Sequence, residues 1–248
     1  MARILVPYHL DENLPSLDVP YEPDRTVTAD LPDGGPWQRM AALYDDVANV
    51  VAHDVRSGGR PVVMSGDCTT SLATVAGLQR AGVDPAIVWF DGHGDVQTLE
   101  TTTSGYLGGM PLRILTGYRP ELISDDLGLR TIPEARVVLV DARDLDLTEA
   151  EFLTTSAVRR CDVEDLVANV IPAGPLYLHI DFDVVTPDEL PGLLFPAAGG
   201  PGLDAVGAAI GRVIATGRVA AVGVGCTWHA GHGNAARVRP LLDEARVA

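Results

Sequence analysis

Lysine is absent from this sequence of 248 residues, so all 18 of its basic residues are arginines. The absence excludes a Schiff-base lysine, a pyridoxal phosphate site and a phosphate-binding loop that ends in Gly-Lys-Ser/Thr. The basic residues are outnumbered by 34 acidic ones, which gives a formal net charge of -16. Because affinity for nucleic acid depends on neutralising phosphates with basic side chains, we expect no nucleic-acid partner. The charge suits metal ions and a cationic small-molecule substrate.

Cysteine is also scarce. The three residues Cys68, Cys161 and Cys226 are far apart and odd in number, so they do not form a disulfide framework. No apolar run approaches the roughly 20 residues of a membrane span, and the amino-terminal residues have no signal-peptide layout. We therefore expect a cytoplasmic protein without a membrane partner. The length suits a single domain over residues 1–248.

Strand-like apolar runs alternate with segments of helical periodicity. The runs are residues 3–7, 61–64, 86–90, 136–140, 176–180 and 219–224. The clearest helical periods lie over residues 37–51 and 203–214, and the latter ends near Gly217. Strands that are apolar at nearly every position, separated by helices, are typical of sheets covered on both faces. The sequence predicts an α/β protein with three layers, α/β/α, and a mostly parallel, doubly wound sheet.

Residues able to bind metal follow two of the strand-like runs. Asp91, His93 and Asp95 come directly after the run 86–90, and Asp181 and Asp183 follow the run 176–180. In a parallel sheet the carboxyl ends of the strands meet at one edge, where ligands bind. The alternating spacing would place these side chains on one side of an extended segment. Four aspartates gathered there would repel one another unless cations lay between them, so we expect two divalent metal ions.

An isolated Asp-x-His-x-Asp sequence is also compatible with a turn held by hydrogen bonds, but the second aspartate pair favours metal binding. Carboxylates and imidazole suit Mn²⁺, Fe²⁺ or Zn²⁺. A pair of such ions can deprotonate a shared water molecule at neutral pH and supply hydroxide as a nucleophile.

Five motifs extend this pattern along the chain. They are SGDC at residues 65–68, DGHGDVQT at 91–98, ETT at 100–102, SGYLGGMPL at 104–112 and DFD at 181–183. In type and order they resemble the motifs of the arginase/agmatinase (ureohydrolase) family. The resemblance implies an arginase-like fold and a binuclear manganese hydrolase of guanidino compounds, in which a bridging hydroxide attacks the guanidinium carbon. It also raises the expectation of a homo-oligomer.

The resemblance assigns roles to individual residues of this chain. Asp91 and Asp181 would bridge both metals, and Asp95 would complete one site and take part in catalysis. His93 and Asp183 would complete the other metal site.

The same resemblance assigns substrate contacts. Asp146 and Glu149 match the region that holds the substrate's amino group, and Gln97 and Ser104 match the region that binds its carboxylate. Glu149 is equally compatible with a solvated residue in the first turn of a helix.

The departures from the family are also informative. Cys68 replaces a histidine ligand, and a thiolate there would favour Zn²⁺, Fe²⁺ or Co²⁺ over Mn²⁺. We expect Cys68 to open a helix over residues 69–82, whose N-terminus would stabilise the thiolate. The alternative is that Cys68 is a small buried filler and one metal site is weak. With this cysteine, the motifs look most like those of the N-hydroxyarginine hydrolases of D-cycloserine biosynthesis.

Two further family residues are missing. The proton-transferring histidine falls at Gly108, and the glutamate that pairs with the guanidinium aligns near Cys226, which we take as a substrate-binding position. His229 and His232 follow closely and could transfer protons instead; the alternative is that they are surface histidines.

Three further histidines have no place in the motifs above. His179 precedes Asp181 by two residues and is either an extra ligand or a partner of the ligands. We take His9 and His53 as structural.

The prediction is therefore a metal-dependent hydrolase of a carbon–nitrogen bond in a linear amidine. Because a guanidinium partner is missing, a hydroxyguanidino or amidine compound such as N-hydroxyarginine fits better than a fully charged guanidinium. The alternative is a degenerate family member that binds metal or a small molecule without catalysis.

Overall fold

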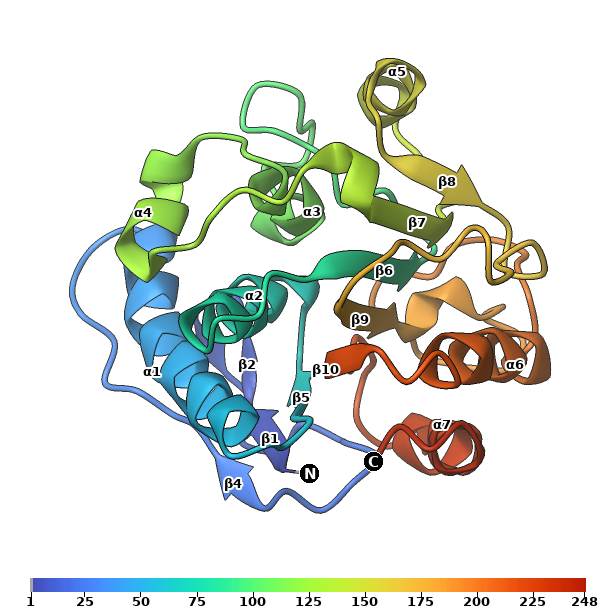
Figure 1. The fold of residues 1–248 in the computed structure, drawn as a ribbon, viewed down its shortest axis with the longest axis horizontal. Coiled ribbons are helices and arrows are strands. Elements are labelled where there is room, and N and C mark those ends of the chain that lie inside the picture. The colour runs from blue at the N-terminus through green and yellow to red at the C-terminus, as the bar shows by residue number, and fades with distance from the viewer. Residues whose placement is uncertain (1) are drawn as a thin grey trace.

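The computed structural model describes residues 2–248 and contains a central sheet of eight parallel strands (Figure 1). Their spatial order is β4-β1-β5-β10-β9-β6-β7-β8. The bounds in chain order are β1 Arg3–Val6, β4 Arg25–Thr26, β5 Val62–Ser65, β6 Ala86–Asp91, β7 Val137–Asp141, β8 Arg159–Cys161, β9 Leu176–Asp181 and β10 Val219–Gly225. A separate antiparallel hairpin joins β2 (Tyr8–His9) to β3 (Glu12–Asn13).

Helices cover both faces of the sheet, and α1 and α2 lie on the face opposite α6 and α7 (Figure 1). Alternate strand residues enter two separate cores: Ile87 and Trp89 of β6 pack with α1 and α2, whereas Val88 and Phe90 pack with α6 and α7. The helices are α1 Pro36–Arg56, α2 Ser71–Arg80, α3 Pro111–Leu115, α4 Ser124–Leu127, α5 Leu147–Thr155, α6 Leu203–Ile214 and α7 Asn234–Glu244. The predicted three-layer fold with a mostly parallel sheet is confirmed.

All six predicted strands are present, as β1, β5, β6, β7, β9 and β10, with ends that differ by no more than one residue. Strands β4 and β8, which form the two edges of the sheet, were not predicted from the sequence. Both are short and begin with the exposed residues Arg25 and Arg159, so they lack the apolar run by which buried strands are detected. None of the helices within residues 2–248 is long and apolar enough to cross a membrane.

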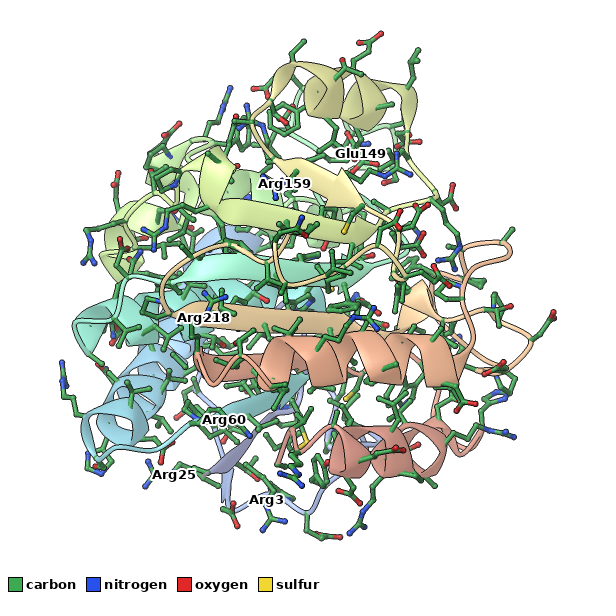
Figure 2. All side chains as sticks on the ribbon, turned by 45° about the vertical axis from the view of Figure 1, so that its right-hand side comes forward. Arg3, Arg25, Arg60, Glu149, Arg159 and Arg218 are labelled. Atoms are coloured by element: carbon green, nitrogen blue, oxygen red, sulfur yellow. The ribbon has the colours of Figure 1, made fainter. Side chains whose placement is uncertain are left out.

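Arginines stand at the amino ends of six strands, on or just before the first strand residue. They are Arg3, Arg25, Arg60, Arg136, Arg159 and Arg218. Several of these guanidinium groups donate to backbone carbonyls of neighbouring segments; Arg218, for example, donates to Pro172 O and Gly174 O. Figure 2 shows Arg60 and Arg218 well apart from Glu149 in α5. The amino edge of the sheet is therefore basic and ties loops together.

Two helical glycines offer a test of the packing between α1 and α2. A Cβ atom on Gly77 of α2 would lie 2.7 Å from the Ala48 carbonyl oxygen and 2.7 Å from Val51 Cβ, whereas one on Gly211 of α6 would meet nothing within 4 Å. Alanine is better than glycine in a helix by about 1 kcal/mol. We expect Gly211→Ala to raise the free energy of unfolding by about 0.5–1 kcal/mol and Gly77→Ala to lower it by about 1–3 kcal/mol. Urea denaturation of both variants measures the difference; equal effects would contradict the close approach.

Candidate metal centre and substrate cavity

A cavity of about 190 Å³ opens at the carboxyl ends of β5, β6, β9 and β10. The predicted site residues that line it are Cys68, Asp91, His93, Asp95, Gln97, Ser104, Asp146, Glu149, Asp181 and Asp183. They come from segments that are up to 115 residues apart in sequence, from 68 to 183. The parallel sheet gathers them because each segment follows a strand that ends at the same edge.

Backbone amides hold three of the aspartates in place. Asp91 ends β6 and accepts hydrogen bonds from the His93 amide at 2.7 Å and from the Trp89 indole at 3.1 Å. Asp181 ends β9 and accepts from the Asp183 amide at 3.0 Å. The Gly92 amide in turn donates to Asp183 at 2.9 Å. The loops after β6 and β9 are thereby tied to each other through the carboxylates that they carry.

The aspartates converge through tight turns, and the expectation of an extended segment is wrong. Strand β6 stops at Asp91, and Asp95 has a left-handed backbone with φ of 54°. Asp183 lies in a 3₁₀ turn. A Cβ on Gly92 would lie 2.8 Å from the Asp183 carbonyl oxygen, so the two loops can approach only because residue 92 is glycine. The side chains face one cavity because the chain bends, and alternation along a strand does not explain it.

The four aspartates are almost completely buried, none exceeding 5% exposure. Burial and the charge of Asp91 raise the pKa of Asp95 well above its usual range, and they raise the pKa of Asp181 to about 6. Burial and Asp181 raise the pKa of Asp183 in the same way. Full ionisation of the four aspartates would thus leave more negative charge than the other residues of the site can neutralise.

His93 is the partner that offsets part of this charge. Its Nδ1 lies 2.9 Å from Asp183 Oδ2 and 3.4 Å from Asp91 Oδ1. Although burial opposes the change, these hydrogen bonds raise the pKa of His93 to about 12. Burial likewise opposes ionisation of Asp91, but the hydrogen bond and charge of His93 lower its pKa. In the absence of metal, a single imidazolium therefore balances only part of the carboxylate cluster.

Two groups of donor atoms are close enough to share a cation. Cys68, Asp91 and His179 form one, and Asp91, His93 and Asp183 form the other, with the ligand atoms of each group within 4.8 Å of one another. Asp95 Oδ2 is buried and has no hydrogen-bond partner within the described chain. Carboxylate, imidazole and thiol donors with an unsatisfied carboxylate oxygen fit divalent metal ions.

Cys68 is buried in the cavity wall, and its Sγ donates to Asp181 Oδ2 at 2.9 Å. Burial and Asp181 raise the pKa of the Cys68 thiol well above its usual range. The predicted helix is present, beginning as a 3₁₀ turn at Cys68–Thr70 and continuing as α2 from Ser71. The expected stabilisation of the thiolate is wrong, because burial and the neighbouring carboxylates raise the pKa of the thiol. Burial and the surrounding carboxylates therefore favour the protonated thiol in the metal-free protein.

The residues assigned to substrate binding line the outer part of the cavity, but they also hold one another. Glu149 accepts from the Asp146 amide at 3.1 Å and the Val96 amide at 3.2 Å and is 5% exposed, so the solvated alternative for it is wrong. Gln97 donates to Asp146 at 2.7 Å and accepts from Thr101 at 2.8 Å. These bonds fix the positions of the side chains in this part of the cavity lining.

Three predicted site residues do not line this cavity. His229 and His232 are exposed, and His229 instead lines a neighbouring apolar pocket. Cys226 is fully buried, and its Sγ approaches the Val224 carbonyl at 3.9 Å. The next residue, Thr227, lines the cavity and donates to Asp181 at 2.6 Å. The chain turns after β10 so that residue 227, not 226, faces the aspartates.

Tyr106 lines the cavity and binds His9 beside it, a pair that was not predicted from the sequence. The Tyr106 hydroxyl lies 2.9 Å from His9 Nε2, and His9 Nδ1 lies 2.9 Å from the Gly66 carbonyl oxygen. A Cβ at Gly108 would collide with the Tyr106 phenol, which therefore fills the space beside that glycine. A tyrosine two residues before the missing histidine was the available signal, but its contact with His9 spans 97 residues.

Comparisons with known proteins agree with this arrangement. The chain matches the model of the Arginase family over residues 7–225. Arginase of Staphylococcus aureus (strain MRSA252) is 28% identical over 198 residues, covering 71% of this chain and 65% of that protein. The N(omega)-hydroxy-L-arginine amidinohydrolase of Streptomyces lavendulae is 34% identical over 149 residues, covering 58% of this chain and 53% of that protein. The chain thus spans between about half and two thirds of these relatives.

Solved structures show the same fold. Arginase from Bacillus caldovelox has a TM-score of 0.82 at 20% identity, covering 99% of this chain and 98% of that chain. Formimidoylglutamase from Bacillus subtilis subsp. subtilis str. 168 has a TM-score of 0.71 at 14% identity, covering 97% and 84%. With the family match extending over most of its length, this chain belongs to the arginase family. The resemblance predicted from the motifs is confirmed.

The carboxylate cluster predicts an unusual pH dependence for the metal-free protein. A carboxyl whose pKa is raised on folding keeps a proton that the unfolded chain releases, so the free energy of unfolding falls as the pH rises above about 4. The raised pKa of His93 acts in the same direction above about pH 6.5. We expect the melting temperature of chelator-treated protein to fall between about pH 5 and pH 8, and to fall less in Asp95→Asn.

The same variant supplies a control. At about pH 8 the metal-free Asp95→Asn protein should melt several degrees higher than the wild type, the shift that about 1–2 kcal/mol causes in a chain of this size. Saturating Mn²⁺ should reverse the order, because the wild type keeps a carboxylate ligand that the variant lacks. Identical melting curves with and without Mn²⁺ would contradict a metal site at Asp95.

Proposed function

We propose that this protein is a metal-dependent hydrolase of a carbon–nitrogen bond in a small guanidino, hydroxyguanidino or amidine compound. The observation that carries the proposal is the convergence of four buried aspartates, His93 and Cys68 on one wall of an open cavity. A cluster that raises the pKa values of its own carboxyls destabilises the metal-free protein and is explained by bound cations. Membership of the arginase family supports the same reaction class.

Two divalent cations would be held by Cys68, Asp91, His93, Asp95, Asp181 and Asp183. When bound, they would supply Lewis acidity and lower the pKa of a water molecule. Manganese is the expectation from the family, and Cys68 favours zinc, iron or cobalt at one position.

The chain's own residues would manage the protons of this reaction. The unpartnered Oδ2 of Asp95 is available to accept a proton from the attacking water. The water oxygen bonds to the central carbon, and the bond from that carbon to the substituted nitrogen breaks. The electron pair goes to the leaving nitrogen, which takes a proton and departs as an amine.

Tyr106 is the group that we assign to donating this last proton. Burial raises the pKa of Tyr106, so its hydroxyl keeps its proton throughout the neutral range. Its hydrogen bond to His9 holds the hydroxyl in place at the cavity. His229 and His232 are exposed outside the cavity and are less suitable.

An N-hydroxyarginine-like substrate is favoured over arginine. Thr227 and the buried Cys226 offer no carboxylate to pair with a guanidinium, and the aspartates are committed to the cations. A hydroxyguanidine is less basic because its oxygen withdraws electron density, so it loses less without such a partner. The name of the Streptomyces lavendulae relative supports this choice.

The substrate class can be tested with protein loaded with Mn²⁺ or Co²⁺. We expect N-hydroxy-L-arginine to be converted to ornithine and hydroxyurea with kcat/KM at least tenfold above that for arginine, agmatine or formimino compounds. Asp183→Asn should lower kcat/KM by about a hundredfold or more because it removes a ligand, and His232→Ala, exposed and outside the cavity, should leave it unchanged. A metal-replete protein that hydrolyses none of these compounds would support the non-catalytic alternative.

The assignment of Tyr106 predicts a second kinetic result. Tyr106→Phe keeps the ring and removes the proton donor, so kcat should fall by about a hundredfold, within the usual range for loss of a general acid. Metal content should not change. Tyr118→Phe is the matched control, since that hydroxyl binds Glu100 at the surface. Full activity of Tyr106→Phe would exclude the proton-donor role.

A further inference from the structure

His179 is a buried imidazole held in one orientation. It lies in β9 with 2% exposure, its Nδ1 is 3.0 Å from Ser71 Oγ, and its ring stacks on Trp89 with 3.8 Å between centroids. The Ser71 hydroxyl also accepts a hydrogen bond from Tyr177 at 2.8 Å. With one nitrogen bound and one face covered, the direction of the other nitrogen is fixed.

That other nitrogen, His179 Nε2, is buried without a hydrogen-bond partner in the part of the chain that the structure describes. A buried polar atom left unpaired is costly, which calls for an explanation. A nitrogen of His179, Cys68 Sγ and a carboxylate oxygen of Asp91 lie within 4.8 Å of one another. Ligand atoms around one tetrahedral zinc lie roughly 3.5 Å apart, so a cation between the three needs only small side-chain shifts.

We propose that Cys68, His179 and Asp91 form one metal site of the centre, with His179 Nε2 as a ligand in addition to those predicted from the motifs. Nδ1–H then donates to Ser71, and the Nε2 lone pair binds the metal, the tautomer that ligating histidines usually adopt. Asp91 is shared with the second group, which includes His93 and Asp183. The proposal rests on the metal centre of the proposed function, though not on turnover.

The two positions consequently differ in chemistry. A thiolate and an imidazole favour Zn²⁺, Fe²⁺ or Co²⁺, whereas the position built from His93, Asp183 and the shared Asp91 is richer in oxygen and accommodates Mn²⁺. The centre therefore selects two different metals when both kinds are offered. Protein given Zn²⁺ and Mn²⁺ together should retain one of each per chain after gel filtration.

Cobalt titration of chelator-stripped protein tests the ligands directly. In the wild type we expect a thiolate-to-Co²⁺ charge-transfer band that saturates at one ion per chain. The variant Cys68→Ser should lose this band. The control Cys161→Ala, which changes a cysteine of edge strand β8, should keep it. His179→Asn presents an amide near Ser71 but has no atom at the Nε2 position. It should keep the band, shift the d–d bands and weaken Co²⁺ binding about tenfold or more.

Unchanged d–d bands and affinity in His179→Asn would overturn the assignment of His179. X-ray absorption of the zinc-loaded wild type does not depend on how the variant folds: His179 and His93 together predict an average of one imidazole per zinc, and half that value would overturn the proposal. Neither measurement uses a substrate. Protein that passes both but hydrolyses no guanidino compound would contradict the proposed function while leaving this metal site intact.

Discussion

Repulsion among four buried carboxylates is the constraint on which the rest of the site depends. Desolvation and mutual charge raise the pKa values of Asp95, Asp181 and Asp183, so the cluster cannot be fully ionised at neutral pH without added positive charge. His93 supplies one such charge, and backbone amides after β6 and β9 supply partial ones. Protons supply the remainder in the metal-free protein, and under the proposed function divalent cations would supply it. On that proposal the tight turns at Gly92 and Asp95 bring ligands together around ions, at a cost to the metal-free protein.

The sheet separates charge along its strands. Acidic side chains gather at the carboxyl ends, whereas arginines occupy the amino ends of six strands and bind loop carbonyls there. A guanidinium group has five donors in a fixed plane and remains charged, so it can satisfy several carbonyls at once while staying partly exposed. These six arginines thus lie at the far edge from the carboxylate cluster, whose carboxylates pair with His93 and with backbone amides instead. The negative potential of the cavity is consequently available for metals and ligands.

Apolar patterning was sufficient to predict the six central strands, because their residues are buried on both faces, and it failed at β4 and β8, which are short edge strands that begin with arginine. The aspartates were found in the same way, as polar residues directly after apolar runs. Their mutual geometry was not found, since 3₁₀ turns and a left-handed residue replace the expected extended segment. Contacts such as Tyr106 with His9 depend on how distant loops pack and leave no local pattern.

Side chains from other sequence positions lie at two of the places where family residues are missing. The Tyr106 phenol occupies the space beside Gly108, and the His179 imidazole faces the same donors as Cys68. A proton donor or a metal ligand has to lie at the right position, but it can come from any residue of the chain. The family histidines that are missing at positions 108 and 68 therefore do not argue against catalysis. The position near Cys226 differs, because its nearest cavity residue, Thr227, is neutral and already donates to Asp181. Under the proposed function the carboxylates would balance the charge of the metal ions, so a substrate that brings little positive charge of its own would fit this cavity best.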